Sequence, residues 1–149
     1  MKITIRPAIE SDTEKIMALV NELAIFEKAA DEVINTADQL KIDGFGNHPL
    51  FKSIVADADH GILGFALYYY RYSTWKGKVL YLEDFYVKEA FRNFGIGKQL
   101  FDEIIKTAKN DKCQRISWQV LDWNEPAIKF YEKYNSQFDK EWWNGYLEM

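Results

Sequence analysis

Residues 80–98 read LYLEDFYVKEAFRNFGIGK, and they join two segments of different character. From Val79 to Val87 the chain is apolar and aromatic apart from two adjacent acids, which is typical of a buried strand. From Leu100 to Ala108, apolar residues recur at the spacing of a helix. A short loop with the pattern Arg-x-x-Gly-x-Gly lies between these segments. The stretch therefore predicts a strand, a glycine-containing loop and a long helix in immediate succession.

The segments on either side alternate between strand-like and helix-like patterns. Further strands are predicted over residues 2–6, 51–56, 61–72 and 115–121, and a short strand pair over 138–147. Helices are predicted after the capping residues 11–14, over 36–43, and from Asn124, where Pro126 suits a first helical turn. This order predicts one mixed α/β domain over residues 1–149, with a largely antiparallel first half.

Composition narrows the class of function. The chain has 149 residues, of which 48% are hydrophobic and 28% charged, as in an ordinary soluble globular domain. Its formal net charge of −4 argues against a dedicated nucleic-acid binder. A single cysteine, Cys113, and two histidines in turn-like stretches argue against a disulfide framework and against a metal site. Since there is no secretory signal and no apolar run near the ~20 residues of a membrane span, we expect a cytoplasmic protein without a membrane partner.

The glycine loop is a candidate anion site. The N-terminus of a helix presents backbone N–H groups that lack helical partners, and glycine lets a phosphate come close to the main chain. Arg92 and Lys98 add mobile positive charge at the two ends of the loop. Neither the third glycine of a dinucleotide fingerprint nor the Gly-Lys-Ser/Thr of a P-loop is present. The pattern suits a pyrophosphate, and an ordinary helix start with flexible glycines is the alternative.

Two adjacent acids, Glu83 and Asp84, interrupt the apolar strand before this loop. Because neighbouring residues of a strand face opposite sides, the two side chains should not both point into the core. At least one should face a cleft, where a carboxylate suits a cationic substrate or accepts a proton. The alternative is that both lie at a strand end in water.

A third candidate element begins at Asn124, whose side chain suits a helix cap. Tyr131 follows seven residues later, on roughly the same face of the helix. A tyrosine there could donate a proton to a leaving group as a general acid. Spacing alone favours the other interpretation, an aromatic core with Phe130 and Tyr134.

In combination these motifs resemble the GNAT N-acetyltransferases. The Arg92–Gly97 loop, its helix, and Asn124-Glu125-Pro126 followed by Phe130-Tyr131 resemble the acetyl-CoA core of that superfamily. A closer resemblance, from residue 3 to about residue 134, is to the spermidine/spermine (diamine) N1-acetyltransferase family and its thialysine Nε-acetyltransferase branch. The motifs that carry it are Ile5-Arg6-Pro7-Ala8, Glu22-Leu23-Ala24, Asp43-Gly44-Phe45-Gly46, His48-Pro49, Leu80-Tyr81-Leu82-Glu83-Asp84-Phe85 and Trp123-Asn124-Glu125-Pro126.

The resemblance implies a GNAT fold, in which helices flank a mixed, mostly antiparallel sheet with splayed central strands. It also implies a homodimer, and acetyl-CoA as co-substrate without a metal. The residues matching the family's contacts to the pantetheine arm are Phe85, Tyr86, Val87, Asn124 and Ala127. Those matching its contacts to the pyrophosphate are Arg92, Asn93, Phe94, Gly95, Ile96, Gly97 and Lys98.

The resemblance also implies roles in the reaction. Tyr131 matches the tyrosine that contacts the cofactor and protonates the departing thiolate, and Glu83 matches the acid that draws a proton from the amine through water. The acceptor side would be lined by Phe26, Glu27, Ser73, Glu83 and Asp84.

One departure from the family pattern concerns the substrate. Polyamine-specific members carry Asp-Pro where this chain has Ser73-Thr74, and this pair, with Leu121, resembles the thialysine branch. Losing an acid removes a partner for the second ammonium of a long polyamine, while hydroxyls suit the zwitterionic end of an amino acid.

The sequence therefore predicts an enzyme that moves an acetyl group from acetyl-CoA to a primary amine of a small molecule by direct attack. The acceptor would be a diamine, a polyamine or a thialysine-like amino acid. Two alternatives stay open, a non-catalytic acyl-CoA-binding sensor and an acetyltransferase that acts on protein amines.

Overall fold

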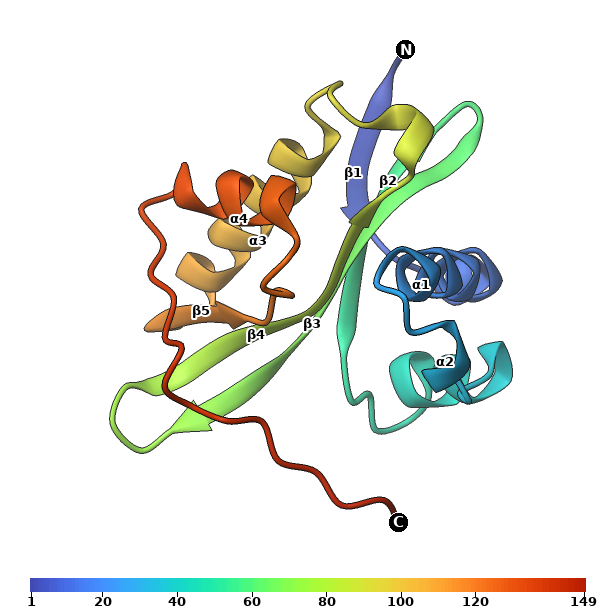
Figure 1. Cartoon of the computed structure of the whole chain (residues 1–149). Helices are drawn as coiled ribbons and strands as arrows, with labels where there is room; N and C mark the ends of the chain where they lie inside the picture. The colour runs from blue at the N-terminus through green and yellow to red at the C-terminus, as the bar shows by residue number, and fades with distance from the viewer. The chain divides into compact units, whose positions relative to one another are not determined.

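Five strands form one sheet in the spatial order β1-β2-β3-β4-β5 (Figure 1). The structure, a computed structural model, describes residues 1–149 in two compact units, Met1–Gln119 and Val120–Met149. The helices and strands of the first unit are β1 (Ile3–Pro7), α1 (Thr13–Phe26), α2 (Ala37–Phe45), β2 (Lys52–Ala58), β3 (Gly61–Ser73), β4 (Gly77–Val87), α3 (Ile96–Asn110) and β5 (Arg115–Trp118). The second unit contains α4 (Glu125–Glu132).

The strands are mostly antiparallel. β1 to β4 each pair antiparallel with the strand that follows in the chain, and β5 lies parallel to β4. The turn between β3 and β4 is tight because the hydroxyl of Ser73 accepts hydrogen bonds from the N–H groups of Trp75 and Lys76, at 3.2 and 3.0 Å. Gly77 ends the turn with a φ of 93°, a conformation that favours glycine. The predicted fold class, a mixed and mostly antiparallel sheet flanked by helices, is confirmed.

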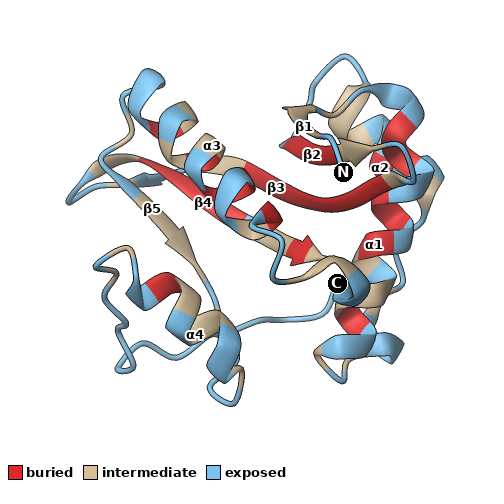
Figure 2. Ribbon diagram, turned by 90° about the horizontal axis from the view of Figure 1, so that it is seen from above, coloured by how far each residue is buried: buried red, intermediate tan, exposed pale blue.

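Helices cover both faces of the sheet (Figure 1). α1 and α2 pack on one face, where the core includes the fully buried Ile16, Val55 and Phe65. α3 packs on the other face, and its buried residues recur at helical spacing: Ile96, Leu100, Phe101, Ile104 and Ala108. The middle strands β3 and β4 are consequently buried over much of their length (Figure 2).

β5 pairs with only the first half of β4. Their parallel pairing runs from Val79↔Arg115 to Leu82↔Trp118, whereas β4 continues to Val87. Phe101 of α3 contacts both strands near the end of this pairing, with ring centres 5.8 Å from Phe85 of β4 and 5.9 Å from Trp118, the last residue of β5. β5 ends at Trp118, so its pairing with β4 stops at Leu82, and the splay of the central strands stays a prediction.

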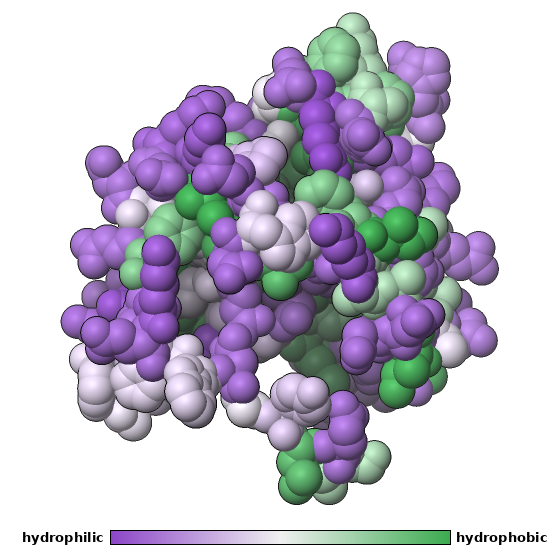
Figure 3. All heavy atoms as spheres, viewed as in Figure 1, coloured by the Kyte–Doolittle hydropathy of each residue, from purple (hydrophilic) through white to green (hydrophobic).

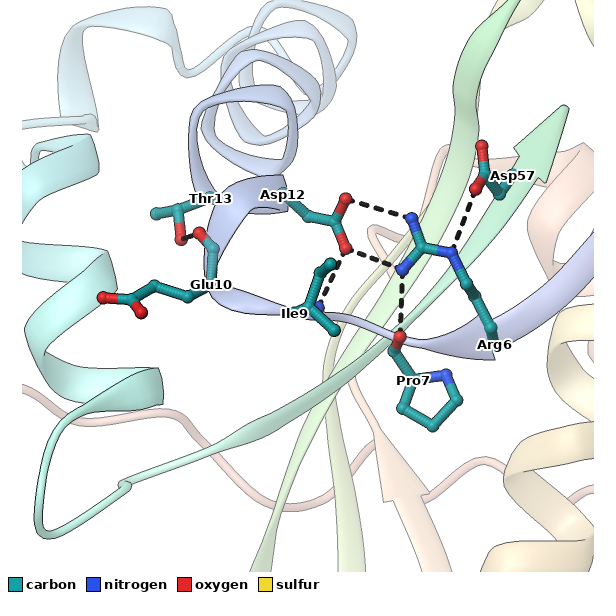
Figure 4. A network of polar contacts seen from close by, with 7 residues as sticks. All are labelled: Arg6, Pro7, Ile9, Glu10, Asp12, Thr13 and Asp57. Atoms are coloured by element: carbon teal, nitrogen blue, oxygen red, sulfur yellow. Dashed lines mark hydrogen bonds and ion pairs between the residues drawn. The ribbon is translucent and has the colours of Figure 1, made fainter. Parts of the chain in front are cut away.

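A network around Arg6 ties the start of α1 to the sheet (Figure 4). Arg6 donates two hydrogen bonds to the Asp12 carboxylate, at 2.8 and 3.0 Å, and one to Asp57 of β2, at 3.0 Å. Asp12 also accepts from the N–H of Ile9, at 2.9 Å, so its side chain closes the turn before α1 and does not cap the helix. The hydrogen bonds from Arg6 hold the pKa of Asp12 below its usual value. The sequence predicted a capping role for residues 11–14, and Asp12 instead binds Arg6.

In the second unit, the predicted start of α4 is confirmed and the predicted strand pair near the C-terminus is wrong. α4 begins as predicted, since the Asn124 side chain accepts a hydrogen bond from the N–H of Ala127, at 3.4 Å, and Pro126 lies in the first turn. The strand pair predicted over residues 138–147 is wrong, because these residues form no helix or strand. A strand needs a neighbouring strand for its hydrogen bonds, which the alternation of side chains alone does not provide.

On the face drawn in Figure 3, hydrophobic residues form small groups separated by hydrophilic residues. None of the helices has the length and apolar character needed to cross a membrane.

Candidate active site

Glu83 and Asp84 point to the same face of the sheet. Tyr68 pairs with Leu82 and Leu67 pairs with Asp84, so that Glu83 is an extra residue of β4 with no partner opposite it on β3. Such a β-bulge breaks the strict alternation of side chains along a strand. The expectation that these two acids face opposite sides is therefore wrong. The reason is the pairing with β3, because the bulge brings the second acid to the face that carries α1.

Both acids line a pocket of about 420 Å³ between α1, α2 and the sheet. Its polar lining consists of Asn35, Asp43, Tyr69, Glu83 and Asp84. The other lining residues are apolar: Met17, Val20, Val33, Leu40, Leu50, Phe51 and Leu67. Three carboxylates and no lysine or arginine therefore surround a space with largely apolar walls. This chemistry suits a cationic ligand with a hydrocarbon chain.

Burial raises the pKa values of several groups in and near this pocket. It raises the pKa of Asp84 to about 7, helped by the negative charges of Glu83 and Glu27. Burial also raises the pKa of Glu27, the residue that follows α1. The hydroxyl of Tyr69 donates a hydrogen bond to the Glu83 carboxylate, at 2.9 Å, and burial together with this bond raises the pKa of Tyr69 to about 12. Asp84 therefore changes its charge near neutral pH, while Tyr69 keeps its proton.

The glycine loop leads into α3 without a side-chain cap. Gly95 precedes the helix with a φ of 79°, and a Cβ added there would meet no atom within 4 Å. The N–H groups of the first helical turn lack helical acceptors, so they are available to an anion approaching over Gly95. An anion can therefore reach these N–H groups, and the binding of pyrophosphate by residues 93–98 stays a prediction.

Arg92 differs from its expected role as a mobile charge. Its Nε donates a hydrogen bond to the carbonyl oxygen of Val87, at 3.0 Å. The guanidinium carbon lies 5.0 Å from the ring centre of Phe26 and 5.3 Å from that of Tyr86. Lys98, at the other end of the loop, is exposed and pairs with Asp102 at 2.6 Å. The arginine is thus held in place, although a role in phosphate binding stays a prediction.

The acceptor-side residues do not all meet in one place. Glu83 and Asp84 line the pocket, whereas Phe26, Glu27 and Ser73 do not. Glu27 is still close enough for its charge to act on Asp84. Ser73 uses its hydroxyl to close the turn between β3 and β4.

In the second unit, Tyr131 of α4 is buried and its ring packs against Phe130, with centres 5.5 Å apart. Phe130 in turn contacts Tyr134, also at 5.5 Å. These are the contacts of the aromatic cluster considered from the sequence. The role of Tyr131 as a proton donor stays a prediction.

Three polar residues of the pocket, Asn35, Asp43 and Tyr69, were not singled out as site residues from the sequence. Tyr69 could have been found by its position two residues after Leu67 on one face of β3, opposite Tyr81 of β4. Asp43 belongs to the Asp-Gly-Phe-Gly motif, but no pattern in the sequence places the end of α2 beside β4.

Comparison with known proteins decides the family. The model of the acetyltransferase (GNAT) family matches residues 16–135. The chain belongs to the GNAT acetyltransferases. It is therefore an enzyme of the acyltransferase class, and enzymes of this family use acetyl-CoA as co-substrate. The structure contains no group of three or more His, Cys, Asp or Glu side chains that could hold a metal ion.

The relatives of this GNAT enzyme agree with the predicted branch. The thialysine N-epsilon-acetyltransferase of Bos taurus is 37% identical over 143 residues, covering 91% of this chain and 84% of that protein. The same enzyme of Mus musculus is 39% identical over 141 residues, covering 89% and 83%. The spermidine/spermine N(1)-acetyltransferase-like protein 1 of Homo sapiens is 38% identical over 134 residues, covering 85% of this chain and 19% of that protein.

Solved structures agree in fold. An integron cassette protein of V. cholerae is similar with a TM-score of 0.80 at 24% identity, covering 100% of this chain and 94% of that one. An aminoglycoside acetyltransferase from a soil metagenomic sample gives a TM-score of 0.79 at 18% identity, covering 99% and 96%. At this identity, the likeness concerns the fold of the GNAT enzyme and not its substrate.

Proposed function

We propose that this GNAT enzyme acetylates a primary amine of a small molecule that carries more than one positive charge. The observation that supports this most is the pocket lined by Asp43, Glu83 and Asp84 with no lysine or arginine. The relatives named for thialysine and for spermidine or spermine support a small amine as the acceptor. Ser73-Thr74 favoured a thialysine-like acceptor in the sequence, but the Ser73 hydroxyl is used within its own turn and does not line the pocket. An amino acid acceptor would bring an α-carboxylate among three others, so we favour a diamine or a short polyamine over a thialysine-like acceptor.

Asp84 is the proposed proton acceptor. A primary amine with a pKa near ~10.4 is protonated at neutral pH and must lose a proton before it attacks. With a pKa raised to about 7, Asp84 is suited to take that proton near neutral pH, directly or through water. The sequence indicated Glu83 for this role and left open whether Glu83 or Asp84 carries the proton. The hydrogen bond from Tyr69 to Glu83 supports a different role for Glu83: its carboxylate, held by Tyr69, would pair with the ammonium group of the acceptor.

On the donor side, acetyl-CoA would supply the acetyl group as a thioester. Residues 93–98 would hold its pyrophosphate through main-chain N–H groups, and the part of β4 from Phe85 to Val87, beyond its pairing with β5, would face its pantetheine arm. Asn124 and Ala127 would contact the same arm, and Tyr131 would give a proton to the departing thiolate. We also propose that the enzyme acts as a homodimer in the cytoplasm.

An assay of thiol release with acetyl-CoA tests the proposal across putrescine, spermidine, spermine, lysine and thialysine. We expect putrescine or spermidine to react with a kcat/KM at least about tenfold above that of lysine, because lysine carries an extra carboxylate. Tyr131→Phe should lower kcat by about tenfold or more and leave acetyl-CoA binding intact.

Three results would contradict the proposal. Binding of acetyl-CoA without reaction of any amine would favour a sensor. Acetylation of peptide amines alone would favour a protein acetyltransferase. Faster reaction of thialysine than of every diamine would refute the preference derived from the pocket lining.

A further inference from the structure

The side chain of Arg92 is held between the glycine loop and the C-terminal end of α1. It bonds to the Val87 carbonyl oxygen at 3.0 Å and lies 5.0 and 5.3 Å from the ring centres of Phe26 and Tyr86. An arginine over aromatic faces at such distances is attracted to both rings. Arg92 therefore fastens Phe26, the last residue of α1, to the end of β4.

The helix whose end Arg92 holds also lines the acceptor pocket, through Met17 and Val20. Glu27 follows Phe26 directly, and its charge acts on Asp84 in the pocket wall. One turn earlier, Glu22 of α1 accepts a hydrogen bond from the Tyr86 hydroxyl at 3.4 Å and pairs with Lys88 at 3.9 Å. Several contacts thus attach this end of α1 to β4, and the one made by Arg92 comes from the start of the glycine loop.

We infer that Arg92 is a positioning residue that sets the place of Phe26 and Glu27 beside the acceptor pocket, so that amine binding depends on the loop that holds the donor. This inference rests on the proposed function. Lysine at the same position would keep the positive charge but would lose the Nε–H donor and the planar group that stacks on the rings.

Steady-state kinetics of two variants separate this role from phosphate binding. Arg92→Lys should raise the KM for the amine by about fivefold, the effect expected for one partly exposed cation–π contact, with little change in the KM for acetyl-CoA. Lys98→Gln is the matched control, since it removes a cation from the same loop away from α1. It should raise the KM for acetyl-CoA and leave that for the amine unchanged. The reverse pattern in Arg92→Lys, or no change in its amine KM, overturns the inference.

A double mutant tests whether Arg92 acts through Phe26. If it does, Phe26→Leu should raise the amine KM, and adding Arg92→Lys to it should raise the KM no further. Effects that multiply would show that the two residues act independently, and would overturn the inference. Thermal unfolding midpoints close to that of the parent chain would show that both variants fold.

Amide hydrogen exchange of the free protein gives a readout that does not depend on activity. We expect faster exchange over residues 23–29 in Arg92→Lys than in the parent chain or in Lys98→Gln. Equal exchange in all three would overturn the inference. If the parent chain acetylates no amine, the proposed function fails, whereas the exchange experiment still decides whether Arg92 holds the end of α1.

Discussion

The carboxylate of Asp84 lowers the stability of the fold while serving the proposed chemistry. Its pKa is about 7 in the folded chain, because burial and two nearby acids disfavour its charge. In the unfolded chain an aspartate titrates near ~3.9. Between these two values the folded chain holds the proton more tightly than the unfolded chain. Stability therefore falls as the pH rises through this window, by at most about 4 kcal/mol.

Asp84→Asn should remove this cost. At pH 8 we expect the free energy of unfolding to rise by about 1–3 kcal/mol, since the variant buries no charge. At pH 4 the gain should largely vanish, because the parent Asp84 is protonated there. Urea unfolding at both pH values measures the difference, and Glu14→Gln, at an exposed acid of α1, serves as a control. An equal gain at the two pH values would show that charge burial is not its cause.

The pH dependence of kcat/KM identifies the proton acceptor. If Asp84 is the base, the profile should break near pH 7, and Asp84→Asn should abolish the break and lower kcat/KM by about tenfold or more. Glu83→Gln should move the break to lower pH, because the charge of Glu83 helps to raise the pKa of Asp84. Loss of the break in Glu83→Gln, with the break retained in Asp84→Asn, would assign the proton to Glu83.

Among the helices and strands, α1 is held against the sheet by an arginine at each end. Arg6 binds Asp12 before the first turn of α1, and Arg92 lies over Phe26 in its last turn. The Asp12 side chain is almost fully buried, with 6% of its surface exposed, so its charge requires the guanidinium. The helix that carries one wall of the pocket is thereby fixed to β1 and β2 at its start and to β4 at its end.

Arg6→Met should lower the free energy of unfolding by about 2–3 kcal/mol at pH 7, because it leaves Asp12 buried without its partner. The pair lowers the pKa of Asp12, so its contribution is complete above the unfolded value of about 3.9 and is lost as the pH falls below it. The variant and the parent chain should therefore differ less at pH 3 than at pH 7 in urea unfolding. Asp57→Asn removes a more exposed partner of Arg6 and should cost less than about 1 kcal/mol. A difference that is the same at both pH values would contradict the role of the ion pair.

Over the whole molecule, sequence patterns predicted the features that depend on one segment by itself, such as a helix and its buried face. The spacing of Leu100, Phe101 and Ile104 predicted α3 and its buried face, since helical packing repeats along one chain. The cap at Asn124 was likewise predicted from its own segment. The mixed character of the sheet followed from the family resemblance, and neither the resemblance nor the spacing of residues identified β5 as the parallel strand.

Features that depend on two distant segments were not predictable in this way. The shared face of Glu83 and Asp84 arises from the register between β3 and β4, which the sequence of β4 does not contain. The strand-like pattern over residues 138–147 lacks a partner strand, and Trp143 there is 95% exposed. Arg92 could be recognised as part of a loop motif, but its contact with Phe26 joins residues 66 positions apart.

Glu83, the extra residue in β4, could be deleted without changing the rest of the sheet. On either side of Glu83 the pairing with β3 is regular. Deleting Glu83 would therefore leave a continuous ladder, and all the remaining β4 side chains would keep their present faces. The architecture would survive the loss, and the pocket would keep a single acid from this strand, freed from the repulsion of its neighbour. The second carboxylate is thus an addition to the scaffold, one that can be gained or lost without redesigning the protein around it.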